Sequence, residues 1–127
     1  MMPKGIKMKL SKKALDGHME TLLMATLQEG PSYGYQIVQD LNGKAPGVLK
    51  TGEGTVYPVL HRLEARGLVR SEWRKGESGR ERRYYILTSE GKAALTSNFQ
   101  EWQALSGVMN LVMGGPGPAP QPAGGNL

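Results

Sequence analysis

The middle of the chain, residues 54–69, predicts a helix that runs directly into a β-hairpin. Apolar residues recur at the spacing of a buried helix face, and Gly67 is a natural C-terminal stop. The residues on this face are Val56, Leu60 and Leu63. Residues 68–75 and 82–88 then predict two short strands joined by a polar turn. A helix followed at once by a two-stranded ribbon restricts a chain of 127 residues to few folds.

Two more helices are predicted upstream of this block. Residues 15–27 place apolar side chains on one helix face, and Gly30-Pro31 ends that helix. Ser32 is expected to cap a second helix, which buries Ile37 and its apolar neighbours and ends at residues 42–43. The third helix should begin close to Thr55, because Pro58 lacks an N–H and fits best in a first turn. An earlier start would distort the helix locally.

Alternation in the second strand places Tyr84 and Ile86 on one face and Arg83, Tyr85 and Leu87 on the other, so one face can pack on the helices. The order of three helices and two strands predicts a winged helix-turn-helix domain with a two-stranded wing. We assign it residues 12–88 and the α+β class, mainly α. Residues 1–11 are expected to form a flexible basic arm.

A last helix is predicted over residues 89–113, with Ser89 as its cap. Its second half is nearly uncharged and carries an apolar stripe too long for one small domain to cover, so a partner chain is the expected solution. Phe99 and Trp102 belong to this stripe and suit either an interface core or the wall of a pocket for a flat apolar ligand. Residues 114–127 are rich in Gly and Pro and are expected to be disordered.

The composition narrows the functional classes. The net charge is +5, and residues 1–13 hold five lysines and no acid, which favours polyanionic partners. There is no cysteine, and no apolar run suits a signal peptide or a membrane span, so we expect a soluble cytoplasmic protein without a membrane partner. No nucleophile elbow, P-loop or cluster of histidines and carboxylates is present, so we expect no enzyme, cofactor or metal site.

The outer face of the third helix indicates DNA recognition, since an amphipathic helix directly before a basic hairpin is typical of a winged-helix reader. Taken alone, the helix would be an ordinary amphipathic one. The residues expected to face a groove are Thr55, Tyr57, Pro58, His61 and Arg62.

Two further groups are predicted to contact phosphate. In the hairpin we favour Arg80 and Arg82, although interleaved glutamates could instead make it a salt-bridged strand pair. At the start of the second helix, hydroxyls and backbone N–H groups can hold phosphate, and either tyrosine could instead pack on the core. The candidates there are Ser32, Tyr33, Tyr35 and Gln36.

Three blocks at these positions resemble the PadR family of transcriptional regulators, over about residues 19–92. The blocks are SYGYQI at 32–37, GTVYPVLHRLE at 54–64 with GLV at 67–69, and GRERRYYILT at 79–88. The resemblance implies a dimeric winged-helix repressor that releases double-stranded operator DNA when a small effector binds. It gives base and phosphate contact to residues 55–62, backbone contact to Ser32 and Tyr33, and wing contact to Arg80 and Arg82.

The resemblance also implies that the last helix is the dimerisation element of a short-form member. The candidate dimer contacts are Leu95, Phe99, Trp102, Leu105, Met109 and Val112. Such a dimer is expected to enclose a pocket for a small apolar or aromatic effector between its C-terminal and N-terminal helices. The candidate lining residues are Leu15, Met19, Phe99 and Trp102.

Three functional hypotheses follow. The first is a homodimeric repressor whose two recognition helices enter successive major grooves of a pseudo-palindromic site. The second is a protein-interaction module with weak or no DNA binding. The third is a small-molecule-binding protein that keeps the fold without an operator.

Overall fold

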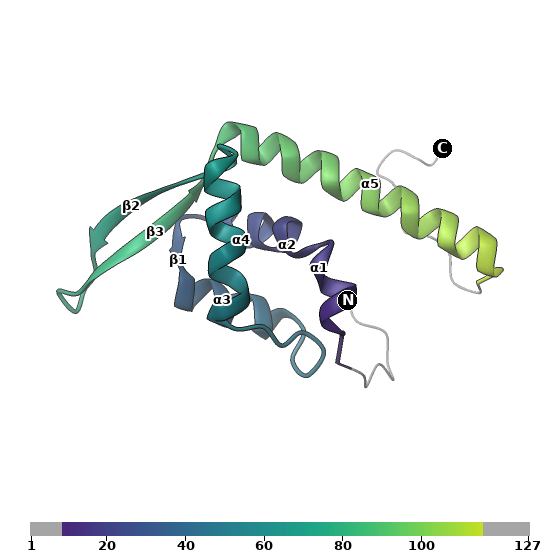
Figure 1. Ribbon diagram of the computed structural model, residues 1–127, viewed down its shortest axis with the longest axis horizontal. Helices are drawn as coiled ribbons and strands as arrows, with labels where there is room; N and C mark the ends of the chain where they lie inside the picture. The colour runs from purple at the N-terminus through teal and green to yellow at the C-terminus, as the bar shows by residue number, and fades with distance from the viewer. Residues whose placement is uncertain (1–8, 116–127) are drawn as a thin grey trace.

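The predicted helix and hairpin are both present in the structure, a computed structural model in which residues 9–115 are described. The elements in chain order are α1 (Lys12–Asp16), α2 (Met19–Leu27), β1 (Ser32–Tyr33), α3 (Gly34–Lys44), α4 (Glu53–Ala65), β2 (Val69–Lys75), β3 (Glu81–Leu87) and α5 (Ser89–Met113). Figure 1 shows α4 between the wing formed by β2 and β3 on one side and α1 and α2 on the other. The predicted winged-helix class is confirmed.

The prediction of a single first helix is wrong. It is divided into α1, capped by the Ser11 side chain, and α2, with Gly17 and His18 between them. Glycine is a poor helix former, so the helix is interrupted at Gly17. The apolar spacing of residues 15–27 continues across this interruption. Of the predicted basic arm, residues 1–8 lie outside the described residues. The Leu10 N–H donates to the Val48 carbonyl at 2.9 Å.

The sheet has three strands, one more than the sequence predicted. β3 is central and pairs antiparallel with β2 on one edge and with β1 on the other. Ser32 therefore pairs with Tyr85 in the sheet and does not cap α3, whose N-cap is Tyr33 without a side-chain cap. This segment pairs with the edge of β3 although about fifty residues separate the two in sequence. Local helix signals do not reveal such a pairing. α3 also continues past the expected end at 42–43, to Lys44.

α4 begins at Glu53, two residues before the expected Thr55, so Pro58 lies inside the helix. The helix continues through Pro58 without a break. Its end agrees with the prediction, because Gly67 has a positive φ of 76° and the Leu68 N–H donates to the Leu63 carbonyl at 2.9 Å. This is a Schellman ending, which favours glycine at the left-handed position.

The cap of α5 is Thr88 and not the predicted Ser89. Its hydroxyl accepts from the Gly91 N–H at 3.0 Å and lies 2.8 Å from the Gly67 carbonyl, so one side chain links the end of α4 to the start of α5. The helix then extends away from the rest of the domain (Figure 1). Of the predicted tail, residues 116–127 lie outside the described residues.

The core lies between α2, α3, α4 and the base of the sheet. The side chains of Leu23, Ile37, Leu60 and Leu63 are fully buried, and β3 contributes Tyr85, on the face that alternation assigned opposite Tyr84. Burying each such leucine contributes about 1.5–3 kcal/mol. Within residues 9–115, no helix is both long and apolar enough to cross a bilayer.

Candidate nucleic-acid interface

The exposed side of α4 has two flanks, one toward the wing and one toward α1 and α2 (Figure 1). The wing flank borders a groove of about 610 Å³ between α4, the start of α3 and the hairpin. Six of the predicted contact residues line this groove. They are Tyr33, Tyr35, Tyr57, His61, Arg80 and Arg82. Residues from three separate parts of the sequence thus form one surface, as the DNA-reading hypothesis requires.

Four predicted contact residues on α3 and α4 are exposed or partly exposed but lie outside that groove's lining. Thr55 lines a different hollow, and Pro58 is exposed on α4. Arg62 faces α2, where its Nε lies 3.8 Å from the Glu20 carboxylate. Gln36 donates to Asp40 at 2.8 Å on the surface of α3.

Ser32 is different, because its side chain is buried within β1. The pairing of this segment with β3 causes the burial. The residue keeps 9% of its surface exposed, and the phosphate contact expected of its hydroxyl stays a prediction.

Tyr57 has a dual position. It lines the groove, but its ring packs so closely on Gly34 that a Cβ at that position would overlap it. Burial, and then the nearby Glu53 carboxylate, raise the pKa of the Tyr57 phenol. The hydroxyl therefore stays protonated at neutral pH and can donate a hydrogen bond.

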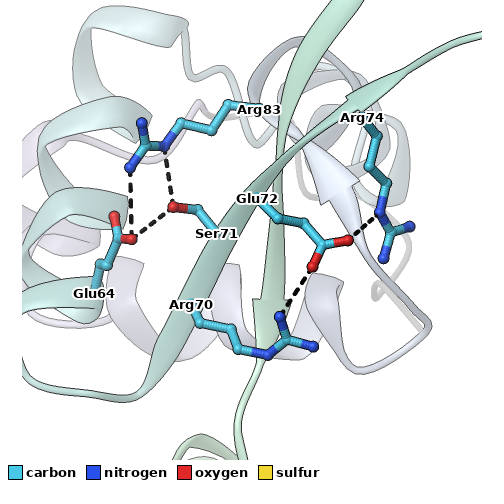
Figure 2. Close-up of polar contacts among 6 residues, drawn as sticks. All are labelled: Glu64, Arg70, Ser71, Glu72, Arg74 and Arg83. Atoms are coloured by element: carbon cyan, nitrogen blue, oxygen red, sulfur yellow. Dashed lines mark hydrogen bonds and ion pairs between the residues drawn. The ribbon is translucent and has the colours of Figure 1, made fainter.

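Most of the wing arginines are engaged by carboxylates. Figure 2 shows Glu72 between Arg70 and Arg74, at 3.0 and 2.6 Å. Hydrogen bonds from Arg74 and Arg70 hold the pKa of the Glu72 carboxyl below its usual value. On the other face of the sheet, Arg83 donates to Ser71 at 3.0 Å and lies 3.6 Å from Glu64 (Figure 2).

Arg80 and Arg82 are the two exceptions. Neither forms an ion pair with a residue in the described part of the chain. Arg80 is exposed near the turn, while the Arg82 guanidinium lies over the Tyr33 ring at 4.5 Å. A cation over an aromatic face keeps its charge available to an anion. The two arginines favoured from the sequence are those without an ion pair inside residues 9–115.

Sequence reasoning missed Trp73. Its side chain is 63% exposed and lines the groove beside Arg83, whose guanidinium lies 5.9 Å from the ring centre. Period-two alternation along residues 69–75 could have found it, because Trp73 lies on the same strand face as the buried Val69. Glu53 also lines the groove and adds a negative charge to it.

Within residues 9–115 of one chain, the proposed effector residues line two separate hollows. Leu15 and Met19 line a hollow beside α1, and Trp102 lines another between α2 and α5. Met19 also belongs to the buried core. Phe99 stacks on Trp102 with 6.0 Å between ring centres, and both rings are about half exposed.

The predicted dimer contacts differ in how far their side chains are exposed. Leu95 is buried in the core of its own domain, so it is not available at the surface as the sequence analysis expected. The other predicted contacts on α5 are exposed over one long stripe. They are Phe99, Trp102, Leu105, Met109 and Val112.

Comparison with known proteins identifies the fold family. The model of the transcriptional regulator PadR-like family matches residues 23–97. A transcriptional regulator of Mycobacterium tuberculosis is 47% identical over 66 residues, which cover 52% of this chain and 58% of that protein.

Two solved structures are similar over most of their length. A transcriptional regulator from Clostridium thermocellum is 31% identical with a TM-score of 0.71, over 78% of this chain and 96% of that one. A PadR family regulator from Eggerthella lenta is 35% identical with a TM-score of 0.68, over 79% and 86%. The chain therefore belongs to the PadR-like family of transcriptional regulators.

Proposed function

We propose that this regulator is a homodimeric repressor that binds a pseudo-palindromic operator with α4 and the wing. The observation that carries the proposal is the groove itself. The exposed side of α4 borders one surface with Arg80 and Arg82, the two wing arginines that form no ion pair within the described part of the chain. A helix and a basic ribbon on one surface can contact bases and the adjacent backbone together.

The roles divide according to position. His61 and Pro58 lie on the exposed side of α4 and are our candidates for base-edge contacts, with Thr55 and Arg62 on its other flank. Arg80, Arg82, Tyr33 and Tyr35 are the candidates for phosphate. Arg62 would exchange the Glu20 carboxylate, 3.8 Å away, for a DNA group.

The dimer is proposed from the exposed stripe on α5. A helix that leaves two aromatic rings and several long aliphatic side chains in water is stabilised when a second copy covers them. Two copies would present two α4 helices, and each would read one half of the operator.

Effector control is proposed at the same helix. Phe99 and Trp102 form a stacked, half-exposed pair that suits a flat apolar molecule. Leu15 and Met19 line a separate hollow beside α1, so the effector proposal rests on Phe99 and Trp102. Binding there would favour dimers with an altered separation of the α4 helices and so release the operator.

The test begins with selection of bound fragments from genomic DNA by the purified protein. Affinity for the recovered site is then compared with affinity for competitor DNA at physiological salt. We expect the recovered site to be bound at least about a thousandfold more tightly. Equal affinity for site and competitor would refute the proposed function. Release of the site by aromatic ligands, with quenching of tryptophan fluorescence, tests the effector.

A further inference from the structure

We propose that a cationic hollow on the α1 side of α4 binds a phosphate group of the DNA backbone, opposite the phosphates reached by the wing. The hollow has a volume of about 170 Å³. Its polar lining residues are Lys9, Lys12, Asp16, Lys50, Thr51 and Thr55. This inference rests on the proposed DNA binding and adds a separate contact site to it.

The lysines come from two segments that the fold holds together. The Leu10 N–H donates to the Val48 carbonyl at 2.9 Å, which places Lys9 beside the loop that leads into α4. The Asn42 side chain fixes that loop from α3, because it donates to the Thr51 carbonyl and accepts from the Thr51 N–H, both at 2.9 Å. Lys9 and Lys50 thus extend from anchored backbone.

The charge of the hollow is positive after its own ion pair is counted. Lys12 lies 3.1 Å from Asp16 and is largely neutralised by it. Lys9 and Lys50 form no ion pair with any residue between 9 and 115. Two lysines around one small hollow, with no carboxylate to pair them, suit an anion of charge −1 such as a phosphodiester.

The start of α4 contributes to the same hollow. Its N-cap is Gly52, which supplies no side-chain cap, and Thr55 in the first turn lines the hollow. Glu53 lines the wing groove, so its carboxylate belongs to the other flank of the helix. Thr51 also lines the hollow, and its buried hydroxyl has no hydrogen-bond partner among the described residues.

The location fits the geometry of a major groove. A helix inserted into a groove about 12 Å wide has a phosphate backbone on both sides. Arg80 and Arg82 line the wing groove, and Lys9 and Lys50 line the hollow beside α1. Figure 1 shows the wing and α1 on opposite sides of α4. The hollow would therefore contact the strand that the wing does not reach.

The experiment measures DNA affinity against salt for the full chain. The test variant is Lys9→Gln with Lys50→Gln. The matched control is Lys13→Gln with Lys92→Gln, which removes the same charge from exposed lysines of α1 and α5 that do not line the hollow. Both the selected operator and a random-sequence duplex are titrated by fluorescence anisotropy.

We expect the test variant to flatten the slope of log affinity against log salt by about two units, one for the phosphate lost at each of the two hollows of a dimer, equally for both duplexes, while the control changes it little. Equal slopes for test and control variants would overturn the inference. Failure of the proposed function has a different signature, because it removes the preference of the wild-type protein for the operator while the slopes still report the phosphate contacts.

Inorganic phosphate, titrated into the wild-type chain and followed by amide NMR, separates the possible sources of the anion. We expect the Thr51 and Thr55 signals to shift weakly, and to shift less in the test variant. Saturation by phosphate together with unchanged DNA slopes would overturn the DNA backbone as the source. No shift and no change in slope would overturn the site.

Discussion

The Arg82 guanidinium lies over the ring of Tyr33, with 4.5 Å between the guanidinium carbon and the ring centre. Tyr33 is the N-cap of α3 and also packs edge-on against Tyr84, at 5.3 Å between ring centres. Arg82 of the wing therefore packs directly on the residue that begins α3. If Arg82 contacts phosphate, Tyr33 positions it.

The replacement Tyr33→Leu should weaken DNA binding by about two- to fivefold, since an exposed cation–π contact is worth about 0.5–1 kcal/mol. The replacement Tyr33→Phe keeps the aromatic face under Arg82 and removes only the hydroxyl proposed to contact phosphate, so it should weaken binding less than Tyr33→Leu does. Fluorescence anisotropy with the selected operator measures both. An equal loss in the two variants would instead assign the effect to the Tyr33 hydroxyl.

The close packing of Tyr57 on Gly34 predicts a large effect from a small substitution. A methyl group at position 34 would overlap the Tyr57 ring, so Gly34→Ala should destabilise the fold by about 1–3 kcal/mol. Gly43→Ala, in the same helix with open space around it, is the control and should stabilise by about 0.5–1 kcal/mol. Urea unfolding measures both. A neutral Gly34→Ala variant would show that Tyr57 can move away without cost.

Tyr85 predicts how stability changes at alkaline pH. Burial raises the pKa of this phenol above its ordinary value of 10.0, although Arg83 opposes the shift. The folded state therefore favours the protonated form. The contribution of the protonated Tyr85 phenol to the free energy of unfolding is complete below pH 10, the ordinary pKa. It is lost as the pH rises through the higher pKa of the folded state. Unfolding measured between pH 8 and 11 should show a steeper alkaline loss for the wild type than for Tyr85→Phe. Parallel curves would contradict this.

The parts of the fold that the sequence predicted are those with local signals. The apolar spacing of α4, the glycine at its end and the two strands of the wing each depend on neighbouring residues, and each was found. The third strand was missed because Ser32 and Tyr33 pair with Tyr85 and Tyr84, far along the chain. No local pattern in two residues encodes such a pairing.

The arrangement of the candidate site residues was predictable to a similar extent. Residue type and register placed His61, Arg80 and Arg82 on one surface, and the groove contains all three. What could not be foreseen is how neighbouring charges are paired. Arg62 and Arg66 both pair with the Glu20 carboxylate, and the Arg66 Nη1 lies 2.7 Å from it. This shared pair follows from the packing of α2 on α4. The pairing depends on side-chain positions that only the folded chain defines.

The exposed stripe on α5 yields the last prediction, which concerns assembly. Leu105 and Met109 are 50% and 57% exposed and lie one helical turn apart. If a second copy covers them, Leu105→Glu with Met109→Glu would bury two carboxylates without partners, so the dimer should dissociate. Gln100→Glu is the control, because Gln100 is exposed on the opposite side of α5 from Met109. Sedimentation velocity measures the mass of each variant.

Operator binding should fail together with the dimer. A monomer presents one α4 and holds half of the site, so it loses the gain in effective concentration that links the two halves, at least about a hundredfold in affinity. The control should keep both its mass and its affinity. A double variant that remains dimeric would place the interface elsewhere, whereas a monomer that binds the full operator as tightly as the wild type would show that one winged helix is sufficient.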